Sequence, residues 1–150
     1  MWGRRVGWIV MMAASLSACS DSDAFAPDPN LADFVGMWDA TALVLSSPVT
    51  PSLSADLIAL GSTFSLNIQP SGQYTAILIF MGQASTEIGR ISRSGETVIF
   101  DRTFPVASRE ISTYVFAASD RLVLDGDTEF DFNQDGIADQ ALAHFELKRR

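Results

Sequence analysis

The residues with the clearest chemistry form an acidic stretch near the C-terminus, from Asp131 to Asp139. Oxygen-bearing side chains stand at positions 1, 3, 5 and 9 of this stretch, and Gly136 at position 6 permits a sharp bend. Such alternation turns carboxylate and amide oxygens toward one point, and oxygen is the ligand that Ca²⁺ prefers. The stretch predicts a calcium site, with Ca²⁺ as cofactor and the ligand set Asp131, Asn133, Asp135, Ile137 and Asp139.

The stretch is similar to the D-x-[DN]-x-D-G-x-x-D calcium loops that link two strands in integrin-type propeller blades. It departs from an EF-hand loop, because the bidentate glutamate of an EF-hand at position 12 is replaced here by Leu142. A hairpin turn without metal explains the same residue types, since Asn, Asp and Gly also favour turns. A weak calcium site and a metal-free turn therefore both stay open at this point.

The one cysteine of the chain, Cys19, ends the sequence Leu-Ser-Ala-Cys. Arg4 and Arg5 precede a short apolar run, from Val6 to Met12, which is too short to span a bilayer as a permanent helix. This arrangement resembles bacterial lipoprotein signal peptides, in which the cysteine becomes the new N-terminus and is acylated. The resemblance implies that residues 1–18 are a signal peptide and that the lipid on Cys19 makes the membrane a partner. A simple secretory peptide that ends in cysteine is the alternative.

Residues 19–30 are expected to form a flexible tether, because they contain few large apolar side chains and two prolines. In lipoproteins of this kind an aspartate directly after the cysteine favours retention in the inner membrane, and here Ser20 stands in that place. The resemblance therefore implies a lipid-anchored protein of the bacterial cell envelope. The outer membrane, on its periplasmic side, is favoured over the inner membrane.

The charge balance of the chain excludes one class of partner. All 18 acidic residues follow Cys19 whereas two of the ten basic residues precede it, so the part after the signal carries a net charge of −10. Nucleic acids and anionic surfaces bind proteins that displace counterions with clustered Lys and Arg. We therefore expect no nucleic-acid partner.

Residues 31–150 carry short segments of period-two alternation between turn signals, which predicts antiparallel strands. Eight strands are expected, at about 36–46, 62–69, 73–81, 84–93, 96–102, 109–117, 121–125 and 138–148. Eight sequential strands in one domain indicate an all-β fold, an antiparallel up-and-down barrel, with a two-sheet sandwich as the alternative. Gly89, inside one of these strands, predicts a bulge or sharp bend.

The longest connection, residues 47–61, is expected to contain a short helix from Ser54 to Gly61. Ser54 would be its N-cap and Gly61 would end it in the left-handed conformation. Its apolar residues either plug one end of the barrel as core or form a lid over the mouth. They are Leu57, Ile58 and Leu60.

The entry into the first strand, Phe34-Val35-Gly36-Met37-Trp38, resembles the opening of the lipocalin-like families through Gly36 and Trp38. The resemblance implies that Trp38 closes the floor of the barrel. It also implies that a basic residue after the last strand, Lys148 or Arg149, packs across the tryptophan in a cation–π contact.

The functional prediction is a membrane-anchored, lipocalin-like binding module that holds a small apolar ligand inside the barrel. Seven residues are predicted to line its interior: Phe64, Leu66, Tyr74, Leu78, Val98, Phe100 and Val115. The alternative is a structural or protein-interaction envelope lipoprotein with a filled barrel and no ligand. The number of charged side chains inside the barrel would distinguish binding or mere packing from catalysis, since two facing carboxylates indicate catalysis.

An enzyme is not expected. His144 is the one histidine of the chain, and a catalytic histidine requires a positioned nucleophile and a group that orients it. The sequence contains no Gly-x-Ser-x-Gly, His-Glu-x-x-His or phosphate-binding loop.

Overall fold

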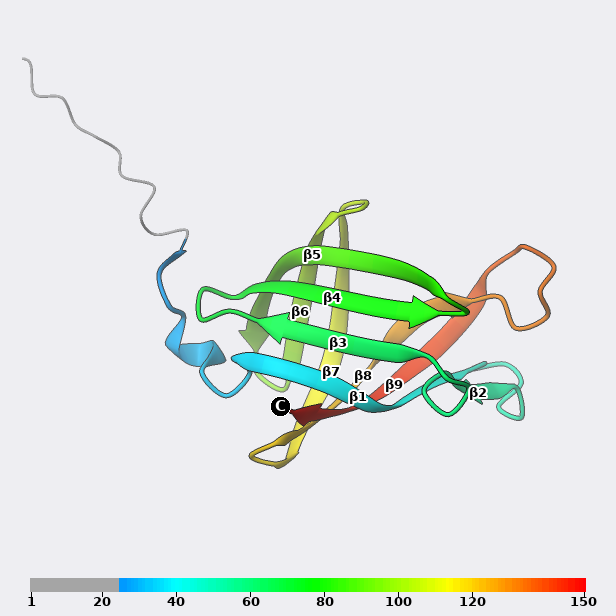
Figure 1. The fold of residues 1–150 in the computed structure, drawn as a ribbon, viewed down its shortest axis with the longest axis horizontal. Coiled ribbons are helices and arrows are strands. Elements are labelled where there is room, and N and C mark those ends of the chain that lie inside the picture. The colour runs from blue at the N-terminus through cyan, green and yellow to red at the C-terminus, as the bar shows by residue number, and fades with distance from the viewer. Residues whose placement is uncertain (1–24) are drawn as a thin grey trace, which may run out of the picture.

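Alternating apolar and polar side chains build a sheet of nine strands in the computed structural model, which describes residues 25–150 (Figure 1). A short 3-10 helix, η2 (Pro29–Leu31), precedes them. The strands are β1 (Gly36–Ser46), β2 (Ser54–Asp56), β3 (Thr63–Ile68), β4 (Gln73–Phe80), β5 (Gln83–Ser94), β6 (Thr97–Phe104), β7 (Ser108–Ala118), β8 (Arg121–Phe130) and β9 (Asp139–Arg149). The predictions for the signal peptide, for Cys19 and for the first half of the tether, residues 19–24, concern residues outside this described range.

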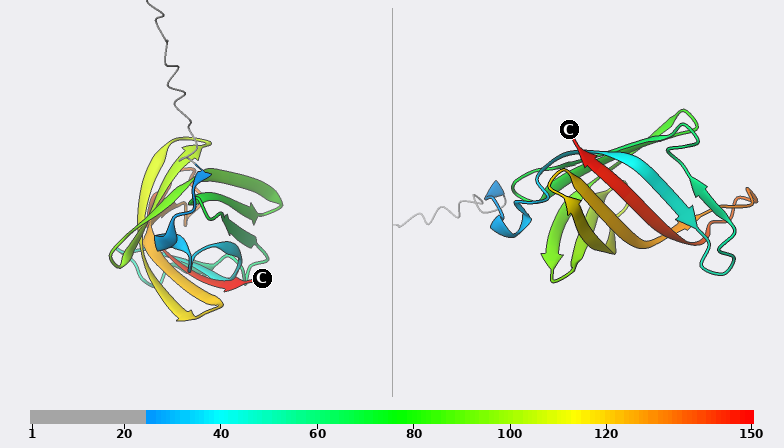
Figure 2. Two further views of the ribbon diagram at one scale, coloured as in Figure 1. Left: turned by 90° about the vertical axis from the view of Figure 1, so that its left-hand side faces the viewer. Right: turned by 90° about the horizontal axis from the view of Figure 1, so that it is seen from below.

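Eight of the strands, β1 and β3 to β9, close into one barrel in which all neighbours are antiparallel. Closure comes from β9, which pairs with β1 from Trp38 opposite Arg149 to Ser46 opposite Leu142. The views in Figure 2 show the strands wound around a common interior. The predicted eight-stranded up-and-down barrel is therefore confirmed, and the sandwich alternative is wrong.

The barrel is tightly closed at one end and split at the other. At the closed end β1 pairs with β3 from Gly36 opposite Ile68 to Asp39 opposite Ser65, and no further. Beyond the register shift at residues 40–42, β1 still pairs with β9 on one side, and on its other side it pairs with β2. The barrel therefore has a mouth, beside which β2 and the loop after β8 lie (Figure 1).

The predicted helix from Ser54 to Gly61 is wrong. Its first residues form β2, which pairs with the end of β1, and only residues 57–61 make a hydrogen-bonded turn. The reason is Asp56, whose Oδ1 accepts from the backbone N–H groups of Leu43 (3.1 Å) and Ile58 (3.0 Å). Asp56 rather than Ser54 caps the turn, and the same carboxylate ties it to β1.

Large apolar side chains fill the closed half of the barrel. Leu31, Phe34, Trp38 and Val98 are fully buried there. A second cluster near the mouth contains Leu43, Leu45, Leu57 and Ala143. Of the two alternatives for this segment, burial of Leu57 agrees with a core plug, whereas Leu60 is 71% exposed. Within residues 25–150 no helix is long and apolar enough to cross a membrane.

Gly89 makes one bend of the barrel possible. The β5–β6 register shifts between Ile88 and Gly89, which confirms the predicted bulge. A Cβ at residue 89 would lie 2.2 Å from the carbonyl oxygen of Asp101 and 2.8 Å from a ring carbon of Tyr74. Only glycine lets β6 approach so closely, and this approach places the next inward residue of β6, Arg102, at the level of the second cluster.

Candidate ligand-binding cavity

A cavity of about 350 Å³ occupies the mouth half of the barrel interior. Its apolar wall comes from β1, the turn after β2, β3, β4, β8 and β9. The apolar lining residues are Leu43, Leu45, Leu57, Phe64, Ala76, Leu78, Phe80, Phe130, Ala143 and Phe145. The size lies within the range of pockets that bind small molecules, and the mixture of apolar walls with a few polar groups is typical of them.

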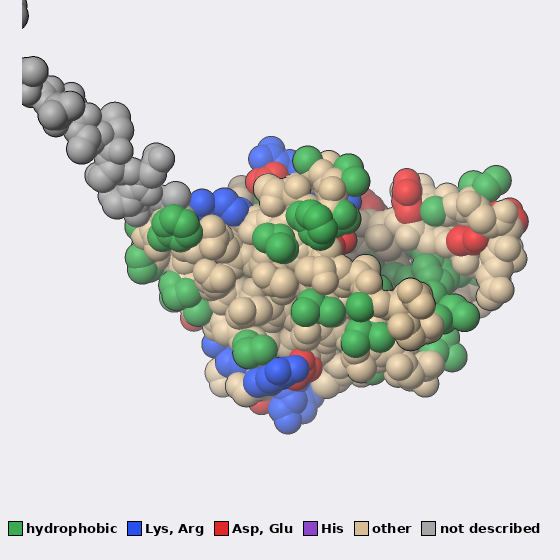
Figure 3. Space-filling view, turned by 45° about the horizontal axis from the view of Figure 1, so that its top comes forward, with side chains coloured by type: hydrophobic (Ala, Val, Ile, Leu, Met, Phe, Trp, Pro, Cys, Tyr) green, Lys and Arg blue, Asp and Glu red, His purple; other side chains and the backbone are tan. Residues whose placement is uncertain are grey.

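The cavity continues outward into a wider vestibule of about 920 Å³. The vestibule lies between the β2 segment, the β4–β5 turn and the loop after β8. It shares Leu57, Phe80, Glu129 and Phe130 with the cavity. Figure 3 shows a hollow beneath the projecting loop at this end of the molecule, with apolar side chains inside it. A small molecule therefore has a route from solvent to the interior.

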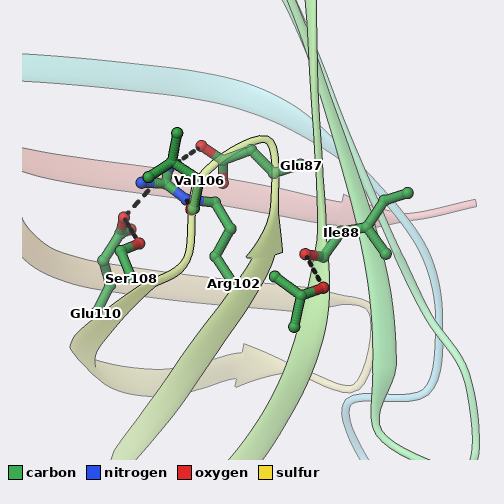
Figure 4. A network of polar contacts seen from close by, with 7 residues as sticks. Glu87, Ile88, Arg102, Val106, Ser108 and Glu110 are labelled. Carbon is green, nitrogen blue, oxygen red and sulfur yellow. Dashed lines mark hydrogen bonds and ion pairs between the residues drawn. The ribbon is translucent and has the colours of Figure 1, made fainter.

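Five charged residues line the cavity: Glu87, Arg102, Glu110, Asp127 and Glu129. Three of them, Glu87, Arg102 and Glu110, come from the neighbouring strands β5, β6 and β7 and contact one another (Figure 4). Nη1 of Arg102 lies 2.6 Å from Oε1 of Glu87 and 3.5 Å from Oε1 of Glu110. Nε of Arg102 donates to the carbonyl oxygen of Val106 at 2.9 Å. One guanidinium therefore holds two carboxylates in a single cluster, and the cluster carries a net charge of −1.

The pKa values of two residues report on this cluster. Burial acts against the charge of Arg102, but the hydrogen bond and charge of Glu87, followed by the charge of Glu110, raise its pKa above the ordinary value. Burial raises the pKa of Tyr74 to about 12, and the charges of Glu87 and Glu110 act in the same direction. Tyr74, which lies deeper in the barrel than the cavity, therefore experiences a negative potential from the two carboxylates.

Six of the seven residues predicted to line the interior do point into the barrel. Two of them, Phe64 and Leu78, line the cavity. The other four belong to the packed core of the closed half: Leu66, Tyr74, Val98 and Phe100. The interior is thus part filled and part hollow, because the largest inward side chains gather at the closed end.

The prediction for Val115 is wrong, since this side chain is 61% exposed on the outer surface. Its neighbours Tyr114 and Phe116 point inward instead and pack against the closed-end core. The segment Tyr114-Val115-Phe116 is apolar on both faces, so period-two alternation alone does not identify its inner side.

The charged cluster was missed in the sequence analysis because its members come from three different strands. Glu87 stands opposite Ala76, Arg102 opposite Gly89 and Glu110 opposite Phe100. The available signal was alternation: Glu110 is two residues from Ser112 and four from Tyr114, both of which share the inner face.

Gly36 and Trp38 build the floor. Trp38 is fully buried, and its Nε1 donates to the carbonyl oxygen of Phe34 at 2.8 Å. Arg149 lies across the ring with its Cζ 4.4 Å from the centroid, and it donates to the carbonyl oxygens of Val35 and Asp33, both at 2.7 Å. The expected cation–π contact is therefore present and Arg149, not Lys148, makes it. Gly36 has a φ of 138°, and a Cβ there would lie 3.4 Å from Nη1 of Arg149.

The acidic stretch forms the hairpin loop between β8 and β9. Oxygens of Asp131 accept from the backbone N–H groups of Asp135 (3.2 Å) and Gly136 (2.8 Å), and Oδ1 of Asp135 accepts from that of Ile137 (2.8 Å). Asp139 lies outside this network, as the first residue of β9 opposite Phe130. In residues 25–150 no three His, Cys, Asp or Glu side chains gather as a metal site requires. Calcium binding by this loop stays a prediction.

His144 lies on the outer face and not in the cavity. Its Nδ1 is 2.6 Å from Oδ1 of Asp125, and its Nε2 is 3.6 Å from Oε1 of Glu146. The hydrogen bond with Asp125 is the main reason that the pKa of His144 is raised, although partial burial opposes the shift. These contacts define a surface ion pair.

Comparison with solved structures gives a similarity of fold. No family model and no curated protein matches the chain. A solved structure described as EF1p2_mFAP2b bound to DFHBI is 13% identical in sequence, with a TM-score of 0.46, and the alignment covers 81% of this chain and 97% of that one. A similarity at this level does not extend to ligand or function.

Proposed function

We propose that this protein is a binding module that holds a small molecule inside its barrel. The observation that carries the proposal is the cavity of about 350 Å³, walled mainly by apolar side chains and open to solvent through the vestibule. The filled-barrel alternative accounts for the closed half of the interior, but it leaves the mouth half without a role.

The module belongs, in this proposal, with the lipocalin-like proteins. The support is local: the glycine, the tryptophan and the arginine that seal the floor stand together as that resemblance implies. Sealing one end of the barrel leaves the other end as the ligand entrance.

We propose binding rather than catalysis at this site, although four acidic residues line the cavity. Glu87 and Glu110 are both engaged by Arg102, and none of the described residues that line the cavity is a histidine, cysteine or lysine. A reaction would require a nucleophile with a base beside it. The cluster is better suited to orient a ligand.

The place of action in this proposal is the bacterial cell envelope, with the protein tethered to the outer membrane by lipid on Cys19. Cells fed with a fatty-acid probe should label the parent protein and the Ser20→Ala control but not Cys19→Ala, because only the cysteine supplies the acylated atom. Equal labelling of Cys19→Ala would remove the anchor from the proposal.

The binding claim is tested with N-phenyl-naphthylamine, a small neutral dye that fluoresces in apolar surroundings. We expect saturable binding to the purified protein, with a dissociation constant on the order of micromolar. Ala143→Leu fills the cavity from β9 and should weaken binding about tenfold.

The matched control is Ala84→Leu, which adds the same atoms on the exposed face of β5 and should bind dye like the parent. Ser112→Leu fills the same cavity from β7 and replaces Ala143→Leu if that variant is not folded. Undiminished dye binding by a folded cavity-filled variant would show that the dye binds elsewhere.

A further inference from the structure

The charged side chains that line the cavity carry a net negative charge. Four acidic residues line the cavity, Glu87, Glu110, Asp127 and Glu129, and Arg102 is the one basic residue among the described residues that line the cavity and vestibule. The guanidinium already contacts Glu87 and Glu110 through Nη1 and the Val106 carbonyl through Nε. The excess charge that a ligand meets in the cavity is therefore negative.

The vestibule also carries a net negative charge. Glu129 and Asp131 border it, on the last residues of β8 and the first residue of the loop. A cationic group that approaches the mouth is attracted at every stage, whereas an anionic group is repelled first by the vestibule and then by the cluster.

Aromatic faces line the path between these charges. Phe130 lies 5.0 Å from Phe132 and 6.2 Å from Phe80, measured between ring centroids, and deeper in the barrel Phe64 lies 5.0 Å from Phe145. Rings in edge and tilted arrangements present their negative faces in several directions. Such faces bind ammonium groups, including quaternary ammonium groups that donate no hydrogen bond.

We infer that the ligand is a cationic amphiphile, an apolar body that carries an amine or quaternary ammonium group. The apolar body packs against Leu43, Leu78 and Phe145, while the cationic group lies beside Glu110. This inference rests on the proposed binding function and specifies the chemistry of the ligand.

Glu110 is the carboxylate most available to such a group. Its side chain is 48% exposed and its Oε1 is 3.5 Å from Arg102, whereas Glu87 is 38% exposed and makes the shorter contact of 2.6 Å. A ligand cation can therefore share Glu110 without breaking the ion pair between Arg102 and Glu87. A fatty acid has no equivalent place, because its carboxylate would need the guanidinium that Glu87 holds.

The test compares three probes with the same eight-carbon chain by isothermal titration calorimetry on the purified protein: octyltrimethylammonium, octanol and octanoate. The two ionic probes are kept below their micellar concentrations and octanol is kept below its solubility limit. We expect the cation to bind about tenfold more tightly than octanol, and octanoate to bind more weakly than octanol. The preference should decrease as salt is raised, because the vestibule charges are exposed to solvent.

Glu110→Gln removes one charge and keeps the shape of the side chain. It should reduce affinity for octyltrimethylammonium about three- to tenfold and leave octanol affinity unchanged. Glu96→Gln is the matched control: Glu96 is exposed in the β5–β6 turn, next to Gly95, whose carbonyl accepts from the closed-end Tyr114. This control should bind all three probes like the parent.

The outcomes separate the two levels of the proposal. Equal binding of the cation and octanol, or an unchanged cation affinity in Glu110→Gln, overturns the cationic class while small-molecule binding stands. Tighter binding of octanoate overturns it in favour of an anionic ligand. Absence of binding by all three probes, together with no binding of N-phenyl-naphthylamine, overturns the proposed function itself.

Discussion

Gly89→Ala lowers the free energy of unfolding by about 3 kcal/mol, through overpacking between two strands. The new Cβ would lie 2.2 Å from the carbonyl oxygen of Asp101 and 2.8 Å from the Cα of Arg102. Both contacts are with backbone, so no side-chain rotation relieves them and β6 must move. Equilibrium urea unfolding of the purified protein measures the loss as a lower midpoint.

Gly126→Ala is the matched control for this substitution. A Cβ at residue 126 would lie 2.7 Å from Oγ of Ser112, a side-chain atom that can rotate away. We therefore expect a loss of about 1 kcal/mol or less. Equal losses in the two variants would contradict the view that the close β5–β6 approach at Gly89 shapes the barrel.

Arg149→Met lowers the free energy of unfolding by about 2 to 4 kcal/mol. The substitution keeps an apolar stem over Trp38 but removes the cation–π contact and two hydrogen bonds to the carbonyl oxygens of Val35 and Asp33. Removing the charge also removes the free-energy cost of its desolvation. The loss in the free energy of unfolding is therefore smaller than the sum of the contributions of the separate contacts. Thermal or urea unfolding followed by circular dichroism gives the value.

Arg150→Met provides the control, because it removes the neighbouring arginine with the same chemistry. Arg150 is 56% exposed and pairs with Asp39 on the surface, so the expected loss is about 1 kcal/mol or less. Arg149→Lys should lie between the parent and Arg149→Met, since lysine keeps the charge without the planar fork. Similar stabilities for Arg149→Met and Arg150→Met would mean that the floor does not depend on this contact.

Most of the barrel could be predicted from sequence because each strand carries its own signal. Period-two alternation with a turn on either side locates β3 to β7 and β9 to within a few residues, and a lone glycine marks the bend in β5. Alternation predicts an end of β8 at residue 125, whereas the strand continues to Phe130. The four residues before Phe130, Gly126-Asp127-Thr128-Glu129, contain no apolar side chain, so pairing with β9 and not the sequence pattern keeps them in the sheet.

The turn after β2 was misassigned for a related reason. Ser54, Asp56 and Gly61 carry ordinary helix-boundary signals, but the backbone of residues 54–56 is satisfied by the free edge of β1. Tertiary pairing therefore overrides a local preference, and the sequence around residue 54 gives no indication that such an edge exists.

The cavity was the least predictable part. Whether an eight-stranded barrel is filled or hollow depends on where its large inward side chains lie along the axis, and this placement follows from the stagger of all the strands together. The same is true of the cluster of Glu87, Arg102 and Glu110, which only the registers of β5, β6 and β7 bring into contact.

In the proposed function, a small molecule binds inside the mouth half of the barrel. The most direct test is nuclear magnetic resonance of the methyl-labelled protein with N-phenyl-naphthylamine, which reports the methyl groups that contact the dye. We expect contacts to Leu43 and Leu78, which line the cavity. We expect none to Ile77 and Ile79, which alternate with Leu78 in β4 and are exposed on its outer face. Contacts from the outer isoleucines alone, or no contacts at all at saturating dye, would contradict binding at this site.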